Sequence, residues 1–228
     1  MYSSMLRSIL VTVAIASFIV GQGGPAPLVI SAQAPAGATR LEMMKGTRVS
    51  FRVREQLAGV DFLNDAVGMT EAVEGALLIK PDGTIDASQS RLTLDVRTFS
   101  TDQERRDNYL LNNVLETGKF PQAVFVARTI TGSPWLSADA KPPFIVGFQL
   151  LGDMTFHGVT KPISWRVVAT HNTAKGMVEG KAMTNFPFST FGLTKPAFAF
   201  LLSVEDDIRL EIDFKMTSSA AVGNASGQ

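Results

Sequence analysis

Residues 207–216 read Asp-Ile-Arg-Leu-Glu-Ile-Asp-Phe-Lys-Met, a stretch in which charged and apolar side chains alternate without a break. Successive side chains of a β-strand point to opposite faces, so this stretch predicts a strand with one wet and one dry face. Outward from it, other segments show the same alternation or an apolar run, and turn signals such as Pro81-Asp82-Gly83 separate them. These further candidate strands are 49–54, 73–80, 92–97, 123–128, 144–151, 163–167 and 177–184.

About eight strands with a wet outer face predict an all-β fold, either a sandwich or a closed barrel. A barrel of eight strands has an interior that side chains fill or that holds one small ligand. Segment 144–151 is apolar on both faces, so we expect another element to cover its outer side.

A single α-helix is predicted at about 103–117. Thr101 to Glu104 form a capping-box pattern, Leu110 to Leu115 carry apolar side chains at helical spacing, and Gly118 is placed to end the helix. The apolar stripe of this helix has to pack over the sheet or over the mouth of a barrel.

The N-terminus predicts export. Residues 1–34 combine a basic Arg7, an uncharged run over 9–20 and a small-x-small site at Ala32-Gln33-Ala34, as a secretory signal peptide does. A helix needs about 20 apolar residues to span a bilayer, and the uncharged run is shorter than that. The alternative to a cleaved signal peptide is an uncleaved N-terminal anchor. We therefore expect a periplasmic or secreted protein. Its remaining parts would be a linker at 35–40, one domain at 41–217 and a disordered tail at 218–228.

Composition argues against several function classes. Lys and Arg together number 21, as do Asp and Glu, so there is no basic surface of the kind that binds nucleic acid. The sequence has no Cys, which excludes disulfides, a Cys nucleophile and a thiolate metal site. His157 and His171 have no partner at metal-ligand spacing, and the sequence contains no phosphate loop, dinucleotide fingerprint or nucleophile elbow. We expect no metal, no cofactor and no catalytic residue.

The sequence is rich in Phe and Met, with 15 and 9 residues, and poor in Trp and Tyr, with 2 each. Such residues suit an adaptable apolar pocket as well as they suit an ordinary core. The composition leaves both interpretations open.

Four stretches carry a resemblance to a known family. Two are the most specific, Lys-Phe-Pro-x-Ala-x-Phe and Gly-Asp-x-Thr-x-His-Gly-Val-Thr-Lys-Pro. The stretches are Ser100–Asp102 with Arg106–Leu110, Gly118–Phe125, Leu151–Ile163, and Phe188–Leu193 with Ser203–Phe214. Over about residues 41–217 the sequence resembles the YceI-like family of periplasmic or secreted proteins. At 188–193 it lacks the charges of an Arg-x-Asp-Phe-Gly-Leu run that is frequent in the family.

The resemblance implies an eight-stranded antiparallel, lipocalin-like barrel, capped by the helix that follows Arg106-Asp107, with a long apolar tunnel. It implies binding, storage or transport of a long-chain isoprenoid, an isoprenoid quinone or a fatty-acid-like ligand, and no established catalytic residues. Transient contact with a membrane would fit this function, and the sequence leaves monomer and homodimer open. The alternatives are an enzyme that acts on a lipid-like substrate and a ligand-free stress or interaction protein.

The dry faces of the strands supply the expected tunnel lining, for which ordinary core packing is the alternative. A polar head group at the mouth would bind Arg106, His157 or Lys161, although Arg106 also suits a salt bridge that fixes the helix. The lining residues that we expect are Phe51, Val53, Leu94, Phe125, Phe148, Trp165, Met183, Leu210, Ile212 and Phe214.

Overall fold

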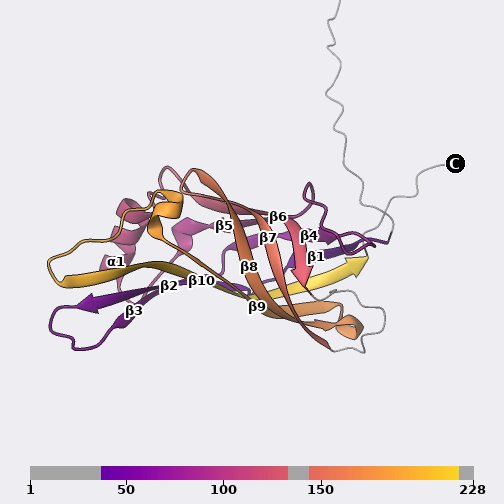
Figure 1. The fold of residues 1–228 in the computed structure, drawn as a ribbon, viewed down its shortest axis with the longest axis horizontal. Coiled ribbons are helices and arrows are strands. Elements are labelled where there is room, and N and C mark those ends of the chain that lie inside the picture. Colours follow the sequence, from indigo (N-terminus) through magenta and orange to yellow (C-terminus); the bar gives the residue numbers. More distant parts are fainter. Residues whose placement is uncertain (1–36, 133–143, 221–228) are drawn as a thin grey trace, which may run out of the picture. The chain divides into compact units, whose positions relative to one another are not determined.

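The computed structural model describes residues 37–132 and 144–220, which form an antiparallel β-barrel (Figure 1). The predicted signal peptide at 1–34 and residues 221–228 of the predicted tail lie outside the described residues. The strands are β1 (Thr39–Met43), β2 (Arg48–Leu57), β3 (Asn64–Thr70), β4 (Val73–Ile79), β5 (Arg91–Asp95), β6 (Gln122–Gly132), β7 (Phe144–Phe156), β8 (Val159–Asn172), β9 (Met177–Phe186) and β10 (Leu201–Ala220).

The ten strand segments make eight strands around the barrel. β1 and β2 follow one another along the same edge of β10, where Met43 pairs with Met216 and Arg48 with Asp213. β3 and β4 follow one another in the same way, because β3 pairs with β2 and β4 pairs with β1. From β4 the ring continues through β5, β6, β7, β8 and β9 to the other edge of β10. The predicted eight-stranded antiparallel barrel is confirmed.

The inner face of the barrel holds the hydrophobic core, and β10 shows why. Its apolar residues point inward as the alternation predicts, and Ile208, Phe214 and Met216 are at most 8% exposed. The expectation that another element covers β7 is wrong for the described part of the chain. On its outer face Ile145 is 76% exposed and Leu151 is 36% exposed.

The helical segment is shorter than predicted. It consists of α1 (Glu104–Tyr109) and a π-helical turn at Leu110–Val114, and it lies at the end of the barrel near the β2–β3 turn (Figure 1). The predicted capping box does not form, because the helix starts after Gln103 and the Asp107 carboxylate reaches back instead. Its Oδ1 accepts from the Thr101 hydroxyl at 2.6 Å and from the Thr101 backbone N–H at 2.7 Å.

The barrel extends slightly beyond the predicted domain at both ends. β1 starts at Thr39, and β10 continues to Ala220, so Ser218, placed in the predicted tail, pairs with Leu41 instead. Short 3-10 turns lie at Val96–Thr98, Thr173–Lys175 and Phe188–Phe191. Of the helices in the described ranges, none has the length and hydrophobicity that crossing a bilayer requires.

Candidate functional site

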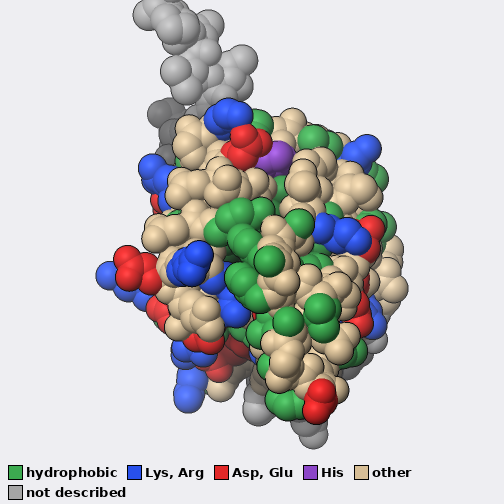
Figure 2. Space-filling view, turned by 90° about the vertical axis from the view of Figure 1, so that its left-hand side faces the viewer, with side chains coloured by type: hydrophobic (Ala, Val, Ile, Leu, Met, Phe, Trp, Pro, Cys, Tyr) green, Lys and Arg blue, Asp and Glu red, His purple; other side chains and the backbone are tan. Residues whose placement is uncertain are grey.

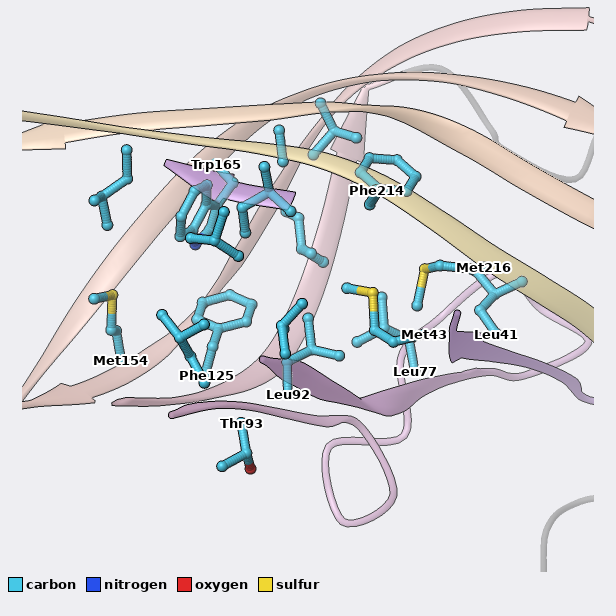
Figure 3. Close-up of a pocket in the computed structure, with 18 of the residues that line it drawn as sticks. Leu41, Met43, Leu77, Leu92, Thr93, Phe125, Met154, Trp165, Phe214 and Met216 are labelled. Atoms are coloured by element: carbon cyan, nitrogen blue, oxygen red, sulfur yellow. The ribbon is translucent and has the colours of Figure 1, made fainter. Parts of the chain in front are cut away.

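The barrel encloses an apolar inner cavity of about 110 Å³. Every residue that lines it has a hydrophobic side chain except Thr93, and Figure 3 shows the Thr93 side chain pointing away from the cluster of apolar residues. The lining residues are Leu41, Met43, Val49, Val73, Leu77, Ile79, Leu92, Thr93, Leu94, Ala123, Val124, Phe125, Ile130, Phe148, Leu150, Met154, Trp165, Val167, Val178, Ala182, Leu210, Ile212, Phe214 and Met216.

Apart from the Thr93 hydroxyl, the indole Nε1 of Trp165 is the one side-chain nitrogen or oxygen among the residues that line this cavity. Its ring packs edge-on against Phe125, with centroids 6.2 Å apart, and the residue is 5% exposed. Among the described residues its indole Nε1 has no hydrogen-bond partner. The inner cavity therefore favours occupants that are almost wholly apolar, because a buried polar group without a partner is costly.

A second, larger cavity of about 540 Å³ lies at the end of the barrel that carries α1. We call it the mouth cavity. Leu210 lines both cavities, so they meet at that residue. The lining residues are Phe51, Val53, Glu55, Leu57, Ala66, Phe99, Gln103, Arg105, Arg106, Tyr109, Leu110, Val114, Leu115, Phe156, Phe188, Leu193, Pro196, Phe198, Phe200, Leu201, Val204, Ile208 and Leu210.

Polar side chains in the mouth cavity gather around Glu55 of β2 and Arg106 of α1. Arg106 Nη2 lies 3.5 Å from Glu55 Oε1, and Arg106 Nη1 donates to Asp102 Oδ1 at 2.5 Å. The Glu55 side chain is 11% exposed, and its Oε1 has no hydrogen-bond partner in the described structure. Burial raises the pKa of Glu55, an effect that the Arg106 charge opposes and the Asp102 charge reinforces.

A glycine makes room for one aromatic wall of the mouth cavity. Gly68 of β3 lies opposite Phe51 of β2, and a Cβ at Gly68 would stand 2.2 Å from the Phe51 ring. That distance is far below van der Waals contact, so only glycine leaves space for the ring. The ring packs edge-on against Phe99, with centroids 5.3 Å apart.

The expected lining residues lie on the inner face with one exception. Phe51 and Val53 line the mouth cavity, and Leu210 lines both cavities. Met183 lines neither cavity, because the inward position on β9 belongs to its neighbour Ala182. The inner cavity contains Leu94, Phe125, Phe148, Trp165, Ile212 and Phe214.

Of the three expected head-group residues, Arg106 lines the mouth cavity, whereas His157 and Lys161 line neither cavity. Lys161 is exposed on β8. His157 occupies the β7–β8 turn with φ of 49°, and its ring nitrogens lie 3.1 Å from Glu116 Oε2 and 3.2 Å from the Phe191 carbonyl.

The His157 contacts join three segments that are far apart in the sequence. Glu116 follows the helical segment in a left-handed conformation with φ of 43°, and Phe191 ends the 3-10 turn. Lys119, which donates to Glu116 at 2.5 Å, and His157 together hold the pKa of Glu116 below its usual range. His157 therefore joins the Glu116 and Phe191 segments, and its side chain lines neither cavity.

The end of the barrel that carries the mouth cavity (Figure 1) exposes large apolar side chains. Phe62 and Leu63 in the β2–β3 turn are 71% and 51% exposed, and Phe200 and Leu202 near the start of β10 are 54% and 61% exposed. Figure 2 shows this end of the barrel, with hydrophobic side chains gathered at its centre and charged side chains around them. Within the described ranges, no three His, Asp or Glu side chains come together as metal ligands would.

Comparison with known proteins finds one family model that matches most of the barrel and relatives that match part of the chain. The model of the YceI-like domain matches residues 43–216. A UPF0312 protein of Pseudomonas fluorescens (strain SBW25) is 31% identical over 149 residues, which are 57% of this chain and 68% of that protein. A UPF0312 protein of Pseudomonas putida (strain GB-1) is 28% identical over 136 residues, which are 54% of this chain and 62% of that protein.

Two solved structures share the fold. A polyisoprenoid binding domain from Saccharophagus degradans superposes with a TM-score of 0.61 at 12% identity, covering 81% of this chain and 100% of that one. BcnA of Burkholderia cenocepacia superposes with a TM-score of 0.54 at 15% identity, covering 74% of this chain and 95% of that one. At these identities the likeness concerns the fold alone.

Proposed function

This chain belongs to the YceI-like family, and on that premise we propose that it binds a long-chain isoprenoid or a related amphiphilic lipid inside its barrel. The observation that carries the proposal is the sorting of polarity along the interior. The inner cavity is lined by hydrophobic side chains, and charged side chains enter the lining only in the mouth cavity. An amphiphile with one long apolar chain and one polar end matches this order.

The energetics suit such a ligand. Removing a methylene-sized unit from water contributes about 0.8 kcal/mol, so ten buried units contribute about 8 kcal/mol, which corresponds to a Kd of about 1 μM. The cost of immobilising the chain weakens this binding, and polar contacts at the head group strengthen it. The tail thus needs no hydrogen bonds from the inner cavity. The Saccharophagus degradans structure that shares this fold is a polyisoprenoid binding domain, and this supports an isoprenoid as the ligand of the present chain.

We further propose that the protein carries the lipid in the periplasm or outside the cell and does not catalyse a reaction on it. Export rests on the leader-like sequence of residues 1–34. The exposed side chains of Phe62, Leu63, Phe200 and Leu202 at the mouth-cavity end of the barrel favour brief contact with the membrane from which a lipid is taken, because clustered apolar groups in water mark sites of contact with a membrane or a partner.

Lipid extraction tests the proposal. The full chain is expressed with its leader, purified from the exported fraction and extracted with organic solvent, and the extract is identified by mass spectrometry. We expect about one long-chain isoprenoid or acyl compound per protein. A folded protein that carries no lipid, and that gains no thermal stability when prenols or quinones are added, would overturn the proposal in favour of a ligand-free interaction protein.

A further inference from the structure

The polar corner of the mouth cavity indicates which head group it accepts. We propose that Glu55 and Arg106 form a head-group subsite for an uncharged lipid alcohol, whose hydroxyl bridges the two side chains. This inference rests on the proposed function, because it places the polar end of the same ligand.

The geometry of the pair leaves room for one bridging oxygen. Arg106 Nη2 and Glu55 Oε1 are 3.5 Å apart, and the contact does not satisfy the hydrogen bond of Oε1. An oxygen atom can lie within 2.7–3.2 Å of both atoms at once. A hydroxyl both donates and accepts, so it can donate to Glu55 Oε1 while it accepts from Arg106 Nη2.

Burial makes that bridge favourable. The Glu55 side chain is 11% exposed, on a strand whose backbone is paired on both sides, with Asn64 of β3 and Val204 of β10. A buried carboxylate oxygen that accepts no hydrogen bond has lost its hydration, and the Arg106 charge at 3.5 Å replaces it only in part. A ligand hydroxyl supplies the missing donor at the place where the apolar walls of the cavity end.

The charges around the pair disfavour an anionic head group. Arg106 is shared between the carboxylates of Glu55 and Asp102, so its charge is already balanced. Arg105 also lines the mouth cavity, but it is exposed to solvent, where a single charge is well screened. A phosphate or carboxylate placed at the pair would face the Glu55 carboxylate directly.

Three ligands with one chain and different heads test the inference. Geranylgeraniol donates and accepts, its methyl ether only accepts, and geranylgeranyl phosphate is an anion. Affinities for the wild-type protein are measured by displacement of a fluorescent lipid at pH 7.5. A hydrogen bond to a charged group corresponds to a preference of about tenfold to a hundredfold, so we expect the alcohol to bind at least about tenfold more tightly than either analogue.

The variant Glu55→Gln then assigns the preference to this residue. Removing the charge leaves Arg106 paired with Asp102 alone and takes away the carboxylate that repels an anion, so we expect the alcohol and the phosphate to come within about threefold of each other. Glu104→Gln is the matched control, because it removes a carboxylate from α1, the helix that carries Arg106, at a position that does not line the mouth cavity. It should keep the wild-type order of affinities. Thermal unfolding of each variant confirms that it is folded.

The outcomes separate the two proposals. If the three ligands bind the wild-type protein equally, or if the phosphate binds most tightly, the head-group inference is wrong and the lipid-binding function stands. If none of the three binds, the proposed function is wrong for isoprenoids and the inference falls with it.

Discussion

Replacing Ala182 by Leu should separate the stability of the barrel from its capacity for lipid. Ala182 is 8% exposed, lines the inner cavity and lies on β9 between its register partners Val167 and Ile212. The larger side chain adds three carbons to a space of about 110 Å³. Filling that space contributes up to about 2.4 kcal/mol from transfer alone, and misfit with the walls takes part of it back. We expect a net stabilisation of about 1 kcal/mol, as cavity-filling substitutions commonly give, and a Tm higher by about 2–4 °C.

Lipid affinity should move in the opposite direction. A Leu side chain that occupies the inner cavity excludes about three methylene-sized units of a bound chain, which costs about 2.4 kcal/mol or about fiftyfold in Kd. Thermal unfolding followed by circular dichroism measures the first effect, and titration with geranylgeraniol measures the second. Val168→Leu is the control, since Val168 is 49% exposed on the outer face of the neighbouring strand β8. It should change neither quantity.

The combination of the two results decides the interpretation. A protein that is more stable and binds the lipid as tightly as the wild type would refute the placement of the chain in the inner cavity. A protein that is less stable and binds weakly would show only that the barrel has been distorted, and the Ala182→Val variant, with two added carbons, then repeats the comparison at smaller volume.

Three other substitutions test separate parts of the structure. Trp165→Glu places a carboxylate in the apolar inner cavity, so the extracted protein should contain no lipid, and a folded variant with unchanged lipid content argues against a chain at that position. His157→Ala removes the contacts to Glu116 and Phe191 and should lower the free energy of unfolding in urea by about 1–3 kcal/mol, whereas an unchanged midpoint would show that the loops hold without it. Because burial raises the folded-state pKa of Glu55, this residue contributes stability below its unfolded pKa that is lost as pH rises through the folded value. Between pH 4 and pH 7, the free energy of unfolding in urea should therefore fall less for Glu55→Gln than for the wild-type protein. Equal decreases in the two proteins would contradict the raised pKa.

Alternation of side chains predicted most of the barrel because each strand has one dry and one wet face. The alternation missed β1 and β3, and β3 turns only small groups such as Ala66 and Gly68 inward. The sequence of β3 gives no sign that Phe51 of another strand fills the space in front of Gly68. The β9 pattern was weak for the same reason, so Met183 was placed inward although Ala182 holds that position.

The polar part of the site was harder to predict than its apolar wall. Arg106 was expected at the mouth, but Glu55 was not, because the two are brought together only when α1 packs against β2. Local pattern contains no information on such a contact. His157 lies in a stretch that is specific to the family, and its neighbours Glu116 and Phe191, far away in the sequence, give it a structural role that its position in a turn did not suggest.

The long strand β10 also decides when the barrel can form. Thr39, near the start of β1, pairs with Ala220, at the end of β10, and β10 is paired along both edges. Pairings between residues so distant in sequence form late and slow the folding of β-proteins, because the chain between them must first be confined. During synthesis or export the N-terminal part of the chain emerges first. β1 and β2 therefore lack their partner β10 until that strand has emerged. The barrel closes only when β10 is available to pair, and until then its apolar inner face remains open to chaperones, to other chains and to lipid.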